Sequence, residues 1–170
     1  MKSAHQQVNQ TSGKVEFYTD PKFVDAARLV MGSIDLDPAS SEIANRTVKA
    51  DRFFTKEDDG LKQQWSGRVW MNHPFSKTQN AEWIKKLVLH FLLGDISEAL
   101  CICYASTSEK WFQPLMQFPQ CFLSPRTNYF SPDGVKLSGV TKGSVVTYLG
   151  NNTDRFRDAF KQFGTVKVIA

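Results

Sequence analysis

The sequence predicts an α/β fold, a doubly wound mixed sheet with helices on both faces. Strand-like segments alternate with segments of helical periodicity along the chain, and no internal repeat interrupts that order. The 170 residues, 41% of them hydrophobic, are enough to close one core. We expect a single domain over residues 15–170 and a flexible N-terminal arm over residues 1–14, which are polar.

A helix is expected to open the domain. Asp20 and Pro21 suit an N-cap and a first helical position, and Gly32 suits the residue after a helix, so residues 21–31 are predicted to be helical. The first half continues with a strand over residues 34–37, a helical or irregular crossover over 40–48, an acidic loop over 57–61 and a strand over 68–71.

The second half contains the clearest periodicity. Residues 81–93 place Trp83, Leu87 and Phe91 on one face of a helix, and residues 98–104 form the most strand-like run in the chain. The other predicted elements are a helix over 109–117, strands over 121–123 and 144–149, a helix over 154–163 and a strand over 165–169. An antiparallel pair is expected at the end of the sheet.

Three positions mark the ends of predicted strands. Asp37 ends the first, Asn72 follows the second and Ala105 follows the third. Ligands of doubly wound sheets bind at the carboxyl ends of the strands. These three positions are therefore expected to lie along one ligand-binding edge.

Composition narrows the function classes. No apolar run is long enough to cross a bilayer, and the N-terminus lacks the apolar centre of a secretion signal, so we expect a soluble cytoplasmic protein. Cys101, Cys103 and Cys121 lie in apolar segments without a second metal-ligand pair, which predicts buried free thiols and no metal site. The net charge of +4 arises entirely within residues 108–170, which carry 8 Lys and Arg against 4 Asp and Glu. Such an excess suits a surface that meets phosphate, although solvated faces also carry it.

The loop Asn72-His73-Pro74-Phe75 has the residue types needed to methylate an exocyclic amino group. The amide of Asn72 and the carbonyl of His73 can accept the two amino hydrogens, which directs the nitrogen lone pair at a methyl donor. Phe75 can stack on a base that has left its helix. The alternative interpretation of this short pattern is an ordinary turn at the end of a strand.

Three other segments can surround a ligand at the same edge. The turn over residues 17–20 suits a cofactor contact, or a hydrophobic staple with a helix cap. The segment from Asp35 to Ser40 ends a strand with a carboxylate, followed by small residues that let a ligand approach. The acidic pair Asp58-Asp59 can accept hydrogen bonds from an adenosine, or form a plain solvated turn.

The order of these segments, from Phe-Tyr-Thr-Asp-Pro at 17–21 to Val-Trp-Met-Asn-His-Pro-Phe-Ser at 69–76, resembles the phage-type (Dam-like) DNA N-6-adenine methyltransferases. The resemblance covers residues 16–150 and implies a Rossmann-like methyltransferase fold, S-adenosylmethionine as cofactor and adenine in double-stranded DNA as acceptor. It places the catalytic loop on Asn72, His73, Pro74 and Phe75. It places the donor site on Phe17, Tyr18, Thr19, Asp35, Asp37, Pro38, Ala39, Asp58 and Asp59. We expect the DNA to meet Arg126, Tyr129, Lys136 and Lys142.

His73 departs from the family pattern, which has proline at this position. Because the required acceptor is a backbone carbonyl, we expect an active but less preorganised loop, to which histidine can add a titratable ring beside the base, and expect His73→Pro to keep or raise turnover. No cysteine lies beside the loop, which argues against methylation of a cytosine carbon.

The expected protein is a monomer or weak dimer, encoded by a phage or prophage and active in the cytoplasm of a bacterial host. Two alternatives stay open. A methyltransferase of RNA or of a protein glutamine amide can use the same loop. A non-catalytic nucleic-acid-binding protein on a decayed methyltransferase fold would also fit the altered loop and the basic last third.

Overall fold

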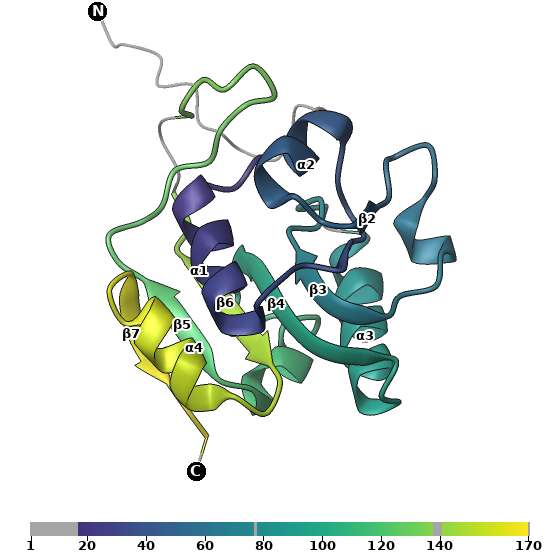
Figure 1. Cartoon of the computed structure of the whole chain (residues 1–170). Helices are drawn as coiled ribbons and strands as arrows, with labels where there is room; N and C mark the ends of the chain where they lie inside the picture. The colour runs from purple at the N-terminus through teal and green to yellow at the C-terminus, as the bar shows by residue number, and fades with distance from the viewer. Residues whose placement is uncertain (1–16, 77, 138–140, 170) are drawn as a thin grey trace, which may run out of the picture.

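The computed structural model describes residues 17–76, 78–137 and 141–169. Its centre is a seven-stranded mixed sheet with the order β2-β1-β3-β4-β6-β5-β7 (Figure 1). The strands are β1 (Leu36–Asp37), β2 (Arg52–Phe53), β3 (Gly67–Met71), β4 (Ile96–Tyr104), β5 (Gln120–Leu123), β6 (Ser144–Leu149) and β7 (Gly164–Lys167). The first four are parallel to one another, whereas β6 is antiparallel to β4 and β5, and β7 is antiparallel to β5.

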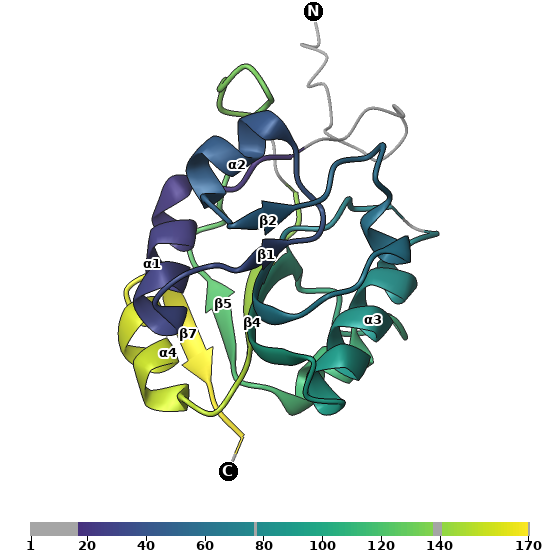
Figure 2. The same cartoon turned by 45° about the vertical axis from the view of Figure 1, so that its right-hand side comes forward.

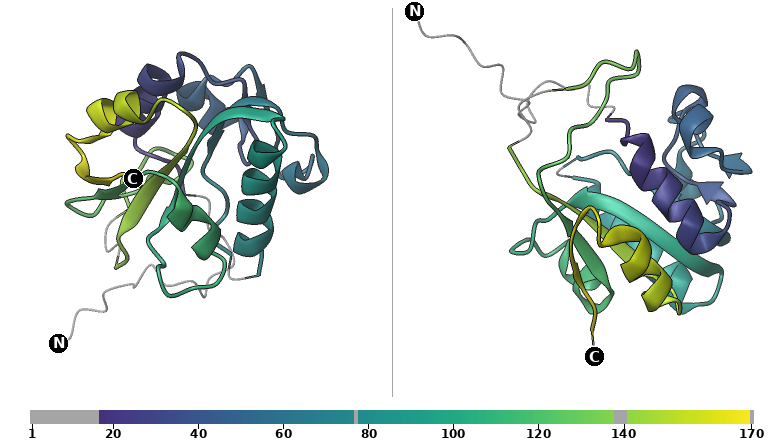
Figure 3. Two further views of the ribbon diagram at one scale, coloured as in Figure 1. Left: turned by 90° about the horizontal axis from the view of Figure 1, so that it is seen from below. Right: turned by 60° about the vertical axis from the view of Figure 1, so that its left-hand side comes forward.

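Helices cover both faces of the sheet. Helices α1 (Pro21–Met31) and α4 (Thr153–Phe160) pack together on one face, and α3 (Asn80–Leu92) covers the other (Figure 3). Helix α2 (Glu42–Val48) contacts α1, with Ser41 as its N-cap. The 3₁₀ helices η1 (Gly60–Lys62) and η2 (Gln113–Gln117) lie against α3.

Each face has its own hydrophobic core. Under α1 and α4, residues such as Val24, Trp70 and Phe156 are buried together, and under α3 the buried residues include Trp65, Leu87 and Cys101. Strand β4 supplies alternate residues to both cores, which explains its long apolar run. The three cysteines are free and buried, as predicted.

The secondary structure departs from the prediction mainly in three places. Residues 109–117 were expected to form an α-helix, but only the 3₁₀ helix η2 forms there, because Pro114 cannot donate the backbone hydrogen bond of an α-helical turn. The two-residue strand β2 was not expected, since so short a strand carries no periodicity. Helix α4 also ends earlier than expected, at Phe160.

The order of the strands creates a switch point between β1 and β3. From β1 the chain moves outward to β2, and it then crosses back to β3 and continues to β4 on the other side. A crevice is expected outside the carboxyl ends of the two strands that flank such a switch point. Asp37 ends β1 and Asn72 follows β3, so both lie at this edge.

Candidate active site

Asp37 is a buried acid at the carboxyl end of β1, where the crevice is expected. Its side chain is only 3% exposed, and Oδ1 accepts a hydrogen bond from the backbone N–H of Ala39 at 3.2 Å. Burial raises the pKa of this carboxyl from 3.8 to about 7, against the opposing hydrogen bonds from Ser40 and Ala39. Among the described residues, no cation pairs with Asp37. A buried acid of this kind favours a cationic ligand.

Asn72 is held by the turn that precedes α1. Its Nδ2 donates to the carbonyl oxygen of Phe17 at 2.8 Å and to Oγ1 of Thr19 at 2.9 Å. Both amide hydrogens are thus used within the protein. Among the residues that the structure describes, no group donates to the amide oxygen.

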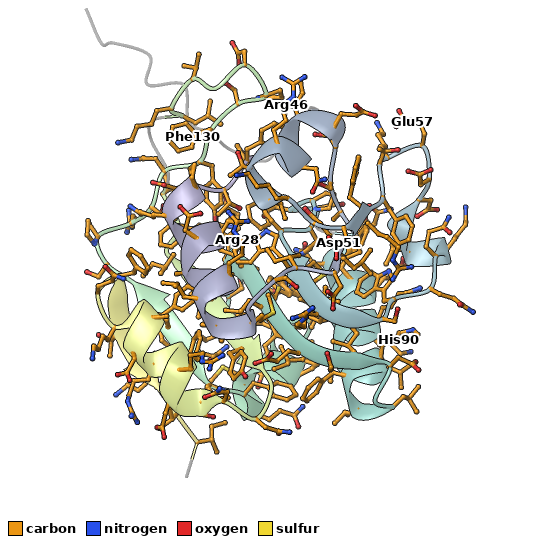
Figure 4. The ribbon with its side chains drawn as sticks, in the orientation of Figure 1. Arg28, Arg46, Asp51, Glu57, His90 and Phe130 are labelled. Carbon is orange, nitrogen blue, oxygen red and sulfur yellow. The ribbon has the colours of Figure 1, made fainter. Side chains whose placement is uncertain are left out.

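The turn that holds Asn72 is itself anchored. Tyr18 and Phe130 exchange two backbone hydrogen bonds, of 2.8 and 2.9 Å. The Tyr18 hydroxyl lies 2.7 Å from Oγ of Ser41, the N-cap of α2. Phe130 lies near the amino end of α1, at the end of the molecule that also carries Arg46 of α2 (Figure 4). The turn, the loop over residues 126–137 and the start of α2 therefore meet above the crevice.

Phe75 belongs to an aromatic cluster beside Asn72. Its ring centroid lies 4.4 Å from that of Tyr104, 5.6 Å from that of Tyr129 and 5.9 Å from that of Phe17. Phe75 is half-buried, so part of the residue stays accessible. A cluster of this kind can form the wall of a pocket for a planar base.

The His73 ring points into the interior, away from the crevice. It is 1% exposed and packs against Phe75, Trp83 and Trp111, and its Nε2 lies 3.1 Å from Oδ1 of Asn80 at the start of α3. The option of a titratable ring beside the base does not fit this position, because the ring is buried in the interior.

Comparison with known proteins identifies a family for this chain. A family model described as DNA N-6-adenine-methyltransferase (Dam) matches residues 10–147. The chain belongs to the Dam family. No curated protein matches it. As a member of this family, the chain is a methyltransferase. The resemblance to this family that the sequence indicated is confirmed.

Asp35 needs a correction within this Dam-family site. Its carboxylate binds Arg68 through Nε at 3.0 Å and Nη2 at 2.8 Å, and accepts the Arg68 backbone N–H at 2.7 Å. This pairing holds the pKa of Asp35 below its usual value. Asp35 thus joins the amino end of β3 to the segment before β1, and both of its oxygens bind Arg68 within the fold.

The acidic loop lies beside the end of β1. A Cβ added to Gly60 would lie 1.9 Å from the carbonyl oxygen of Pro38, so the two backbones touch. Asp58 accepts hydrogen bonds from the backbone and hydroxyl of Thr55, both at 2.8 Å, and therefore shapes the loop. Asp59 pairs with Lys62 at 2.9 Å on the surface. Asp58 is exposed, whereas Asp59 is only partly exposed and has the flexible Lys62 side chain as its partner.

The residues predicted to meet DNA divide into two groups. Arg126, Lys136 and Lys142 are exposed, and the segment from 126 to 137 lies at the end of the molecule where α1 begins (Figures 1 and 2). Tyr129 is 1% exposed and its hydroxyl bonds Oγ of Ser144 at 2.7 Å. The prediction that Tyr129 contacts DNA is therefore wrong, since its ring supports the aromatic cluster from within.

A pocket beside Tyr104 was missed by the sequence analysis. It has a volume of about 300 Å³ and is lined by Tyr104, Ala105, Ser106, Ser108, Glu109, Lys142 and Gly143. The Lys142 ammonium lies 5.4 Å from the centre of the Tyr104 ring. No local pattern marks this pocket, because its two sides come from the end of β4 and the start of β6.

Two features are absent from the described ranges. No group of three His, Cys, Asp or Glu residues there is arranged to hold a metal ion. None of the helices in those ranges is long and apolar enough to cross a membrane.

Proposed function

We propose that the chain transfers the methyl group of S-adenosylmethionine to the exocyclic amino group of adenine in double-stranded DNA, on a Rossmann-like methyltransferase fold. The observation that carries the proposal is the Asn72 amide, which is held at the switch point by both of its hydrogens and keeps its oxygen for a substrate. An amino group is the substrate group that such an acceptor orients.

The donor would occupy the crevice between β1 and β3. Asp37 offers a buried negative charge to the donor's ammonium group, and Pro38 and Ala39 beside it are small enough for close approach. The turn over residues 17–19 closes the other side, and Asp59 lies where it can accept a hydrogen bond from ribose or adenine. These residues fit a cationic nucleoside. S-adenosylmethionine supplies a methyl group on a sulfonium, and its transfer to nitrogen leaves a neutral thioether.

The loop orients the acceptor. The Asn72 oxygen and the His73 carbonyl accept the two hydrogens of the adenine amino group, which frees the nitrogen lone pair from the ring, while Phe75 stacks on the flipped base. The nitrogen becomes cationic as it gains the methyl group and then releases a proton to water. No general base is needed at residue 73, which agrees with the inward position of its ring.

The DNA backbone would run over the basic surface of the last third. Lys136 and Lys142 are exposed, and the exposed Arg126 begins the segment that carries Lys136. Contacts to phosphate position the duplex without reading its sequence. The enzyme would act in the cytoplasm of a bacterial host cell, encoded by a phage or prophage as its resemblance to such enzymes implies.

The test is a direct methylation assay. The full chain is incubated with S-adenosylmethionine carrying a labelled methyl group and with unmethylated double-stranded DNA, and N6-methyladenine is quantified after digestion to nucleosides. We expect label in adenine from the natural chain and none from Asn72→Ala, whereas the exposed Asn151→Ala control stays active. Parallel reactions contain RNA or a glutamine-containing peptide. Label only in those arms would replace DNA as the substrate, and donor binding without any methylation would identify a non-catalytic binder.

A further inference from the structure

The contacts of Asn72 determine which end of its amide faces the crevice. Nδ2 meets the Phe17 carbonyl oxygen at 2.8 Å, and a carbonyl oxygen can only accept a hydrogen bond. If the amide turned over, two oxygens would face each other at that distance. The carbonyl alone therefore fixes the nitrogen inward and the oxygen outward.

Thr19 supplies the second contact. Its Oγ1 lies 2.9 Å from the same nitrogen, and a hydroxyl oxygen can accept the remaining hydrogen. With two acceptors about one planar NH₂ group, the amide plane is fixed as well as its direction. A single contact would leave the plane free to rotate about the bond to Cβ.

The turn is rigid enough for this task. Asp20 caps α1 by accepting from the N–H of Lys22, and Pro21 starts the helix. Tyr18 pairs with Phe130 through the backbone and with Ser41 through its hydroxyl. Thr19 lies between these anchors, so its hydroxyl has a fixed position relative to β3.

We infer that Thr19 is a positioning residue, which orients the Asn72 amide so that only its oxygen meets the target amino group. The inference rests on the proposed function and refines it. It moves Thr19 from the donor site, where the sequence comparison put it, to the acceptor side. It also explains why residue 72 is Asn in this chain, because an Asp there would set a carboxylate oxygen against the Phe17 carbonyl.

The kinetic test compares Thr19→Val, which removes the hydroxyl at nearly constant volume, with Thr19→Ser, which keeps it. At saturating donor we expect kcat on DNA to fall about 10- to 100-fold in Thr19→Val and to recover in Thr19→Ser, while KM for the donor stays within about twofold. Thr47→Val, a change of the same type at the end of α2, serves as the control. An unchanged kcat, or a loss confined to donor KM, overturns the inference.

A second measurement does not depend on activity. In nitrogen-15 NMR of the unliganded chain, the side-chain NH₂ hydrogens of Asn72 should exchange slowly with water, and Thr19→Val should speed the exchange of one of them by about tenfold. If the natural chain methylates nothing but shows this protection, the proposed function fails and the positioning inference stands. If the hydrogens exchange freely in the natural chain, or Thr19→Val leaves their exchange unchanged, the inference fails.

Discussion

Replacing Asp37 by Asn should stabilise the free protein at alkaline pH and weaken donor binding. The substitution keeps the shape of the side chain and its bond from the Ala39 N–H, and removes the charge. Because burial raises the pKa of Asp37 from 3.8 to about 7, the folded chain holds a proton between these values that the unfolded chain has lost. This contribution to stability is complete below pH 3.8 and is lost as the pH rises through about 7.

The size of the effect follows from the shift. A shift of about three units corresponds to about 4 kcal/mol, at 1.36 kcal/mol per unit. Between pH 4 and pH 8, natural Asp37 should therefore lose about 4 kcal/mol of stability relative to Asp37→Asn, since all other titrating groups are shared by both proteins. Urea unfolding of the two proteins across this range measures the difference. Parallel curves would mean that Asp37 is already ionised at low pH and that burial does not control it.

The same group should release a proton when the donor binds. At pH 6 a carboxyl of pKa about 7 is about 90% protonated, and an ammonium partner favours its ionised form, so nearly one proton should leave for each donor bound. At pH 8 the release from this group should fall to about one tenth of a proton. Calorimetric titration in two buffers of different ionisation enthalpy measures the release, and Asp37→Asn should abolish this component and weaken binding. Equal binding and equal proton release in both proteins would remove Asp37 from the donor site.

Three further outcomes are expected. The double variant Lys136→Glu with Lys142→Glu should lower DNA affinity and reduce the slope of log affinity against log salt concentration by about 2. The control Lys167→Glu on β7 should change neither. An unchanged slope in the double variant would show that DNA binds another surface. His73→Pro should lower the free energy of unfolding, measured in urea, by about 2–4 kcal/mol, because it removes a ring that is 1% exposed and deprives Asn80 of its partner. An unchanged free energy of unfolding would show that the ring is dispensable for stability. Gly60→Ala should lower the free energy of unfolding by about 1–3 kcal/mol and weaken donor binding, since its Cβ would lie 1.9 Å from the Pro38 oxygen. Gly143→Ala, whose Cβ would have no atom within 4 Å, should leave stability unchanged. Equal stability of the two variants would contradict the close approach at Gly60.

The sequence predicted the elements that have long periodic patterns. Helices α1 and α3 and strands β4 and β6 lie within two residues of their expected bounds, since each repeats its pattern over several turns or alternations. Asp37, Asn72 and Ala105 were expected to share one edge because their strands were expected to be parallel. Strands β1, β3 and β4 are parallel, so their carboxyl ends lie at one edge of the sheet, as expected. Local sequence patterns are sufficient to predict a helix or strand when the element is long and its partners are neighbours in the chain.

The errors concern contacts between distant segments. Asp35 had the residue type of a ligand contact, but its partner Arg68 lies 33 residues away and no local signal marks the pair. Tyr129 lies in a polar loop, yet its ring is buried in the core, where its hydroxyl forms a hydrogen bond with Oγ of Ser144. The link between Thr19 and Asn72 spans 53 residues. Side-chain direction at loop positions is set by such tertiary partners, so sequence patterns did not determine it.

The proposed catalytic loop, residues 72–75, combines two separate requirements. The side of the loop that faces the crevice needs an amide oxygen and a backbone carbonyl in fixed positions, and a proline at residue 73 would supply rigidity through its own ring. In this chain the His73 ring supplies rigidity differently, by filling the space against Trp83 and Trp111 and by binding Asn80 at the start of α3. Because the carbonyl of any residue can accept the amino hydrogen, this replacement preserves the chemistry of the loop. It also makes the rigidity of the loop depend on the core beneath it, whereas proline would have made it a local property of the chain.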